Sequence, residues 1–267
     1  MLGNRTDRKR HPMAETPNKK VVRVQSTPEE QTAQTSAPQW TPTPEAKGQA
    51  TTFRWIAALL WALAIGAEVF AIFWVLRQNP VNMIILIGLL VVIAGLAIGG
   101  SLLWKRANRL DPAPKSEPVR FFVQNQLGAI VTVIAFLPLI VLIFTDKNMS
   151  GQQKGVAGGI GIVLLLVAGY FGVSINPPSV EQYTAETQQV TDATGQNLVY
   201  WTKEGKVFHL CEKVSAVNLT SKDNTIYSGT VAEAHAAGKP RLTLEVETER
   251  KQCGFDTTST PAPSPTP

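Results

Sequence analysis

Four long stretches between residues 55 and 176 carry almost no charge, and they constrain this chain more than any other feature. They cover residues 55–76, 82–104, 121–145 and 156–175, and Glu68 is the one Asp, Glu, Lys, Arg or His among them. About 20 apolar residues are enough for a helix to cross the roughly 30 Å hydrocarbon layer of a membrane. Lipid offers no hydrogen-bond partners to the backbone, so we expect these stretches to be helices. Helices of a soluble bundle would need a polar face, which these stretches lack.

The average composition hides this pattern. With 44% hydrophobic residues, 17% charged residues and a mean hydropathy of +0.03, the chain as a whole resembles a soluble protein. Its apolar residues are nevertheless concentrated in the middle, and both ends are polar. This distribution excludes one large globular core, a disulfide-rich secreted scaffold and a wholly disordered chain. The predicted fold class is an all-α transmembrane bundle of four helices, followed by a small α+β C-terminal domain, with disordered tails.

The same pattern predicts five regions along the chain. Residues 1–53 form a basic tail with Thr-Pro pairs, and residues 54–176 hold the four membrane spans. Residues 177–195 suit a polar connecting helix, residues 196–255 a small module, and residues 256–267 a tail rich in Ser, Thr and Pro. Both tails have few large apolar side chains, which is typical of disorder.

The Lys and Arg residues are distributed unevenly over the segments that flank the spans. The tail through Arg54 has nine and the connection 105–120 has five, whereas the two other loops together have three. Because positively charged segments stay on the cytoplasmic side, the tail and that connection are predicted to be cytoplasmic. Four spans return the chain to the same side, so we expect both termini of this cell-membrane protein in the cytoplasm. The first span follows a long basic tail, which is typical of an uncleaved signal anchor.

Glu68 is the candidate functional residue inside the membrane. An ionised carboxylate in lipid is costly, so such a residue is expected to face the bundle interior. The other spans hold no Lys, Arg or His to pair with it, which favours the protonated form. Two interpretations stay open. Glu68 either couples a proton or cation in a small transporter, or makes a structural hydrogen bond to a neighbouring helix.

Small residues recur four positions apart in two spans. Gly95 and Gly99 lie in the second span, and Gly155 and Gly159 lie where the fourth begins; Gly158, Gly161, Gly169 and Gly172 follow in the same segment. Glycine lets helix backbones approach closely, so these residues predict helix packing, within the bundle or against another protomer. Pro138 predicts a kink in the third span.

Short patterns predict the elements of the C-terminal module. Residues 198–202 and 206–210 are β-prone and flank Glu204-Gly205, which predicts a hairpin, and residues 225–228 suit a further strand. Thr230-Val-Ala-Glu233 fits a capping box at the start of a helix that ends at Gly238. Residues 241–247 fit either a strand or a helix.

Three segments of this module resemble a known family. They are Val199-Tyr-Trp-Thr-Lys, Val207-Phe-His-Leu-Cys and Ser228-Gly-Thr-Val-Ala-Glu-Ala-His-Ala-Ala-Gly-Lys. They resemble the C-terminal module of uncharacterised bacterial multi-pass membrane proteins, which is distantly similar to the zinc unit of the DNA-methylphosphotriester repair protein. The resemblance implies a fold without the metal. Where the family has ligand cysteines this chain has Val214 and Thr243-Leu-Glu-Val, so neither a metal nor another cofactor is expected.

Cys211 and Cys253 are the two cysteines of the chain. A disulfide between them is expected if the module is extracytoplasmic, because disulfides persist in oxidising compartments. In the cytoplasm, two reduced cysteines are the favoured interpretation. A metal site that combines them with His209 and His235 has no standard ligand spacing.

The sequence contains no motif that predicts an enzyme. It predicts a non-enzymatic anchor or binding protein of the membrane, which presents its C-terminal module to a protein partner. The expected partners are the lipid bilayer, a second copy or another membrane protein, and a protein that binds the module. We expect no nucleic acid, since the basic tail lacks interleaved aromatic residues. The alternative is a small transporter or channel subunit that uses Glu68.

Overall fold

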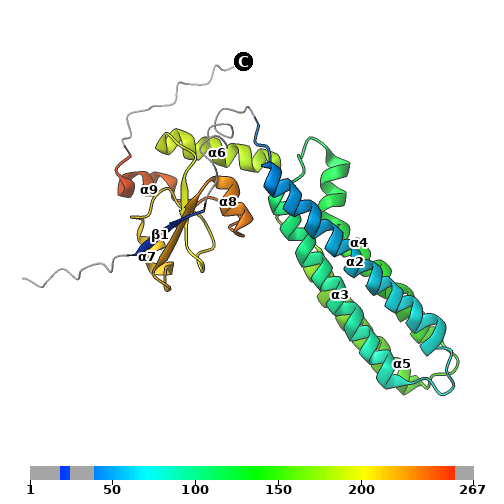
Figure 1. Ribbon diagram of the computed structural model, residues 1–267. Helices are drawn as coiled ribbons and strands as arrows, with labels where there is room; N and C mark the ends of the chain where they lie inside the picture. The colour runs from blue at the N-terminus through cyan, green and yellow to red at the C-terminus, as the bar shows by residue number, and fades with distance from the viewer. Residues whose placement is uncertain (1–18, 25–38, 256–267) are drawn as a thin grey trace, which may run out of the picture.

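Figure 1 shows a computed structural model in which a long bundle of helices carries a small mixed module at one end. The structure describes residues 19–24 and 39–255. Most of the predicted N-terminal tail and all of the predicted C-terminal tail therefore lie outside the described residues. The bundle consists of the helices α2 (Pro44–Phe70), α3 (Met83–Leu110), α4 (Pro118–Thr145) and α5 (Gly151–Gly172), and a π-helical turn, η1 (Ala71–Val75), continues α2.

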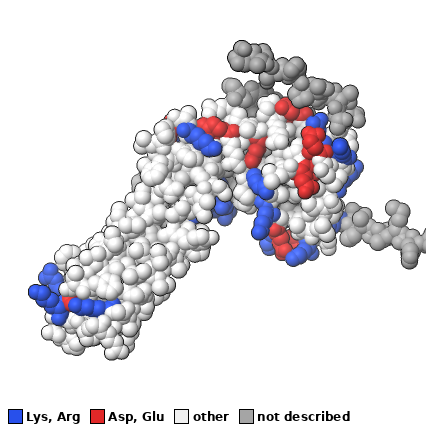
Figure 2. All heavy atoms as spheres, turned by 180° about the vertical axis from the view of Figure 1, so that it is seen from behind, with Lys and Arg blue, Asp and Glu red and all other residues white. Residues whose placement is uncertain are grey.

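All four bundle helices are long and apolar enough to cross a membrane. Their outer faces carry large apolar side chains such as Leu63, Ile134 and Leu166, which are half or more exposed. Figure 2 shows charged side chains gathered at the two ends of the molecule, with an uncharged shaft between them. The chain is thus a membrane protein, and the predicted fold class is confirmed.

The helices extend beyond the predicted apolar stretches because polar residues cap them. The side chain of Thr43 accepts a hydrogen bond from the backbone N–H of Ala46, with Pro44 at the first helical position, so α2 starts well before residue 55. Ser150 and Gln153 form a capping box at the start of α5. The prediction of disorder through residue 53 is therefore wrong for the first turns of α2.

The module contains four helices and a three-stranded sheet. The helices are α6 (Val180–Thr194), α7 (Ser215–Thr220), α8 (Val231–Ala236) and α9 (Val246–Cys253), and the strands are β1 (Lys20–Arg23), β2 (Val199–Trp201) and β3 (Thr225–Gly229). In the order β1-β3-β2, β3 pairs parallel with β1 and antiparallel with β2. The predicted hairpin is present as the antiparallel bridge between Tyr200 and His209. Of the segment 241–247, Leu242 forms a parallel bridge with Phe208, and helix α9 begins only at Val246.

Strand β1 comes from the tail that the sequence predicts to be disordered. Lys20 pairs with Thr225 and Arg23 with Ser228, so β1 forms one edge of the sheet, as Figure 1 shows. The prediction that residues 20–23 belong to a disordered tail is therefore wrong. The segment has no local signal beyond two adjacent valines, and its pairing partner lies about 200 residues further along the chain.

Separate hydrophobic clusters stabilise the two parts. The bundle core is built mainly from small and aliphatic side chains where α2, α3, α4 and α5 meet. The main core of the module is much smaller and combines aromatic and aliphatic side chains: Val190, Val199, Trp201, Phe208, Leu210, Val231, Ala234 and Leu242. Two further small clusters are Val214, Val217 and Ile226 in the module, and Ala50, Ala107 and Leu110 where the bundle meets Ala236. A module core of this size contributes little stability by itself, so the module depends on other links.

Candidate functional site

The module is joined to the bundle by an aromatic contact. The buried Tyr183 of α6 donates a hydrogen bond from its hydroxyl to the carbonyl of Arg109 at the end of α3, at 2.9 Å. The ring of His235 on α8 stacks on Tyr183 with centroids 3.8 Å apart, and its Nε2 lies 2.5 Å from Oε2 of Glu186. Burial, together with nearby Glu186, raises the pKa of Tyr183, so the hydroxyl stays protonated.

Contacts at the end of the bundle and between the bundle and α6 complete this joint. Within the bundle, Arg54 of α2 contacts Asp111, the C-cap residue of α3, through the carboxylate at 2.7 Å and the carbonyl at 2.9 Å. Glu181 of α6 accepts hydrogen bonds from the backbone N–H groups of Lys115 and Ser116 in the α3–α4 connection. Burial opposes the ionisation of Glu181, but these donors hold its pKa below the ordinary value. The module therefore docks through specific contacts on the end of the bundle.

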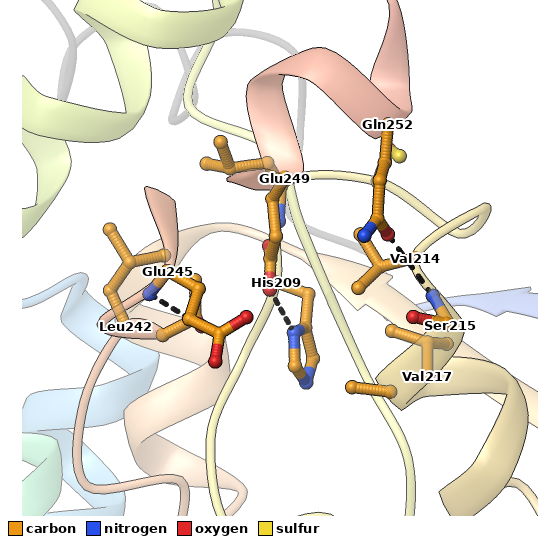
Figure 3. Close-up of polar contacts among 12 residues, drawn as sticks. His209, Val214, Ser215, Val217, Leu242, Glu245, Glu249 and Gln252 are labelled. Atoms are coloured by element: carbon orange, nitrogen blue, oxygen red, sulfur yellow. Dashed lines mark hydrogen bonds and ion pairs between the residues drawn. The ribbon is translucent and has the colours of Figure 1, made fainter. Parts of the chain in front are cut away.

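Helix α9 contacts the end of the second hairpin segment. Oε1 of the buried Glu249 lies 2.6 Å from Nδ1 of His209, and its Oε2 accepts the backbone N–H of Leu210 at 3.0 Å. Figure 3 shows Glu249 extending from α9 toward His209. One turn later, Cys253 of the same helix forms a disulfide with Cys211. We call this set of contacts the α9 clasp.

The disulfide differs from the expectation of two reduced cysteines. Cys211 and Cys253 lie 6.0 Å apart between their Cα atoms and are joined covalently. The positions of His209 and Glu249 bring them together, since the buried pair aligns α9 along residues 209–211. Across the described residues, no group of three or more His, Cys, Asp or Glu side chains is placed to hold a metal ion.

A pocket of about 530 Å³ lies beside the sheet of the module. Its apolar lining includes Val24, which follows β1, and Trp201 and Tyr227 from the other two strands. The rings of Trp201 and Tyr227 are stacked with centroids 6.4 Å apart. The charged lining residues are Lys203, Asp223, Glu233 and Lys239. An apolar pocket with a few charged groups is the usual form of a ligand site.

Lys239 shapes one wall of this pocket. Its side chain is 7% exposed, and its Nζ donates hydrogen bonds to the carbonyls of Gly205 at 2.6 Å and Lys203 at 3.1 Å. Burial lowers the pKa of Lys239. Sequence reasoning missed this pocket because its lining comes from several segments far apart in the chain. A local signal existed for Trp201, a large aromatic residue in a short strand, but none existed for Val24.

Glu68 lies inside the bundle, where it is 3% exposed. Its Oε1 accepts a hydrogen bond from the backbone N–H of Leu139 at 3.3 Å. Leu139 directly follows Pro138, which lacks an N–H and interrupts the hydrogen-bond ladder of α4. The π-helical turn η1 begins three residues after Glu68. The carboxyl group therefore lies where α2 and α4 both depart from regular helix geometry.

The glycines predicted to pack helices fall into two groups within the chain. A Cβ atom added at Gly95, Gly155 or Gly159 would meet no other atom within 4 Å, and one at Gly99 would meet Leu60 at an ordinary 3.5 Å. Of the predicted glycines, Gly158 lies close to Phe144 and Gly172 close to Gly128, and Gly100, which is outside the predicted set, lies close to Trp61. A four-residue spacing finds a helix face, but it does not tell which face meets a neighbour.

Comparison of this chain with protein-family models, with curated proteins and with solved structures found no match, so the residues and geometry above carry the functional argument.

Proposed function

We propose that this membrane protein is a non-enzymatic binding protein, in which four spans anchor a fixed head that binds a partner. The head is the C-terminal module with β1. The observation that carries the proposal is the pocket beside the sheet, which combines the stacked rings of Trp201 and Tyr227 with charged groups. The contacts of Tyr183 and Glu181 hold this head at a set position on the bundle.

The two histidines of the head support binding rather than acid–base catalysis. His209 is buried and paired with Glu249 inside the α9 clasp. His235 is buried between Tyr183 and Phe208 and paired with Glu186. Neither imidazole lines the pocket. A general base has to reach the proton that it removes, and both rings are instead used in packing.

The test compares partner recovery by three full-length variants in native membranes. Ala237→Trp fills the pocket with a large side chain, and Lys203→Glu reverses one charge of its lining. Lys213→Glu is the matched control, because Lys213 is exposed in the same module but does not line the pocket. A partner that is cross-linked to the wild type and to Lys213→Glu, but at least tenfold less to both pocket variants, supports the proposal. Equal recovery by all variants contradicts it.

We further propose that the head is cytoplasmic. The support is the distribution of Lys and Arg, with fourteen on the side of the N-terminal tail and the α3–α4 connection and three on the other side. The disulfide between Cys211 and Cys253 argues for the opposite side, because such bonds are rare in reducing compartments. The charge distribution therefore favours a cytoplasmic head, whereas the disulfide favours a head on the opposite side of the membrane.

A pair of single-cysteine labels decides between them. Ser264→Cys marks the C-terminal end and Lys147→Cys marks the α4–α5 loop at the far end of the bundle. With an impermeant thiol reagent on intact cells, we expect labelling of Lys147→Cys and none of Ser264→Cys. The reverse pattern would place the head outside, where the disulfide is stable.

A small transporter remains the second candidate, because Glu68 lies between two helix irregularities in the bundle interior. If Glu68 carries protons, Glu68→Gln abolishes proton-coupled flux and leaves expression intact. If its role is structural, the amide oxygen of Gln accepts the same hydrogen bond from Leu139, and the free energy of unfolding changes by less than about 1 kcal/mol. Flux measured in proteoliposomes, beside thermal stability in detergent, separates these outcomes.

A further inference from the structure

Strand β1 pairs with the head through its backbone. Lys20, Val21 and Arg23 are exposed, and Val22 is only half-buried. By contrast, the backbone N–H groups of Lys20 and Val24 donate to the carbonyls of Asn224 and Ser228, at 3.0 and 2.8 Å. Main-chain pairing of this kind accepts many sequences, because it does not depend on the side chains.

Two side chains at the ends of the segment add selectivity. The ammonium group of Lys19 donates to the carbonyl of Asn218 at 2.6 Å and to the hydroxyl of Ser221 at 2.5 Å. Five residues later, Val24 lines the pocket of the head together with Trp201 and Tyr227. The segment is therefore fixed by a lysine at one end, a backbone ladder in the middle and an apolar side chain at the other end.

The apolar end fits its pocket loosely. The pocket measures about 530 Å³, far more than a valine side chain occupies, and Val24 remains 38% exposed. Its other apolar lining residues are the aromatic Trp201 and Tyr227 and the small Ala236 and Ala237, and Lys203 and Asp223 are also on its lining. A larger apolar side chain at the position of Val24 would bury more surface against Trp201 and Tyr227.

From these contacts we infer that the edge of β3 is a binding site for an extended peptide of a partner protein, occupied in this structure by the chain's own residues 19–24. The partner segment carries a lysine, a β-prone run and, five residues after the lysine, a bulky aromatic residue. It adds to the sheet as a parallel strand and displaces β1. This inference rests on the proposed binding function and names the partner's chemistry.

A pair of proline variants tests the strand site in the full-length protein. The backbone N–H groups of Lys20 and Val24 face β3. Because the direction of the N–H alternates along a strand, the N–H of Val22 also faces β3, whereas the N–H of Val21 points away. Val22→Pro therefore removes a ladder hydrogen bond, and Val21→Pro keeps all of them. The readout is hydrogen exchange at Ile226 and Ser228, whose amides face β1. We expect at least tenfold faster exchange in Val22→Pro and no change in Val21→Pro.

Peptides added to Val22→Pro in lipid nanodiscs test the recognition chemistry. The peptide of residues 19–24 restores protection of Ile226 and Ser228 at millimolar concentration, the usual effective concentration of a binding segment within the same chain. A Val24→Trp version does so at about a tenfold lower concentration, and a Lys19→Glu version needs about a tenfold higher one. Protection of Tyr227, whose amide faces β2, stays constant throughout and shows that the head remains folded.

Three results would overturn the inference. The first is equal exchange in Val22→Pro and the wild type, and the second is the failure of every peptide to restore protection. The third is wild-type protection that falls on dilution, because β1 would then come from a second copy of the chain. The pocket variants Ala237→Trp and Lys203→Glu report separately on the proposed binding function. Peptide binding without partner recovery would therefore contradict that function and leave the strand site intact.

Discussion

The bundle and the head of this protein are stabilised by different means. In the bundle, α4 and α5 meet where Gly128 and Gly172 bring two backbones into contact, and long apolar helices fill the remaining space. In the head, short elements surround a small core and are tied by the α9 clasp, with its disulfide and its buried His209–Glu249 pair. The bundle thus depends on close packing of its helices, whereas the head depends on a few covalent and hydrogen-bonded links.

This difference follows from the two solvents. Lipid is as apolar as the side chains of the bundle, so helix association there depends on packing and on close backbone approach. Water drives the burial of apolar surface in the head, but a unit of this size buries too little to be stable without further links. We therefore expect the stability of the head to fall when a single link is lost, and the stability of the bundle to fall when a side chain at a helix contact becomes larger.

Loss of the disulfide is expected to have the largest effect. Cys253→Ser opens a loop with a sequence separation of 42 residues, which lowers the free energy of unfolding of the head by about 4 kcal/mol in the chain-entropy description. Exchange of the β3 amides should rise steeply, while the helices of the bundle stay protected. Cys211→Ser should behave identically. Unfolding of the bundle in either variant would break the comparison, because the two regions would then be one cooperative unit.

Loss of the buried carboxylate comes next. Glu249→Ala leaves Nδ1 of His209 and the N–H of Leu210 buried without their acceptor, which should cost about 3 kcal/mol. The matched control is Glu247→Ala on the same helix, since Glu247 makes one exposed contact with Arg250 and should change stability by less than about 0.5 kcal/mol. Hydrogen exchange of the β3 amides at increasing urea concentration measures both. Equal effects would mean that the α9 clasp is no more than a surface contact.

A glycine pair tests the bundle. A Cβ atom at Gly172 would lie 2.7 Å from the backbone nitrogen of Ala129, so Gly172→Ala must separate α4 from α5 and should cost about 2 kcal/mol. At Gly169, one turn earlier, a Cβ would meet no atom within 4 Å, and Gly169→Ala should leave stability unchanged or raise it slightly. Thermal unfolding in detergent provides the measurement. A loss of stability at Gly169 instead would show that this face contacts a partner helix.

The sequence predicts the bundle well because its signal is local. Length and the absence of charge fix four spans, and caps such as Ser150 refine their ends once they are recognised. The same reasoning selected Gly158 and Gly172, which make close contacts, together with Gly95 and Gly155, at which an added Cβ atom would meet no other atom within 4 Å. Hydrophobicity is nearly uniform around these helices, so no pattern marks the face that packs inward.

The head is predicted only where its elements are specified locally. The capping box of Thr230 and Glu233 and the hairpin around Gly205 were both visible in the sequence. Strand β1 and the pocket were not, because each forms from segments far apart in the chain. The α9 clasp also escaped prediction, since no spacing relates Glu249 to His209 until the sheet has placed both.

The pairing of β1 with β3 also requires that the chain cross the membrane an even number of times between the two strands. Residues 20–23 are synthesised before the first span and residues 225–229 after the last one, yet the two strands lie side by side. Only an even number of crossings can bring them to the same face of the bilayer. A chain that inserts with one span missing or reversed cannot complete its sheet, so the finished head distinguishes correctly threaded molecules from misthreaded ones.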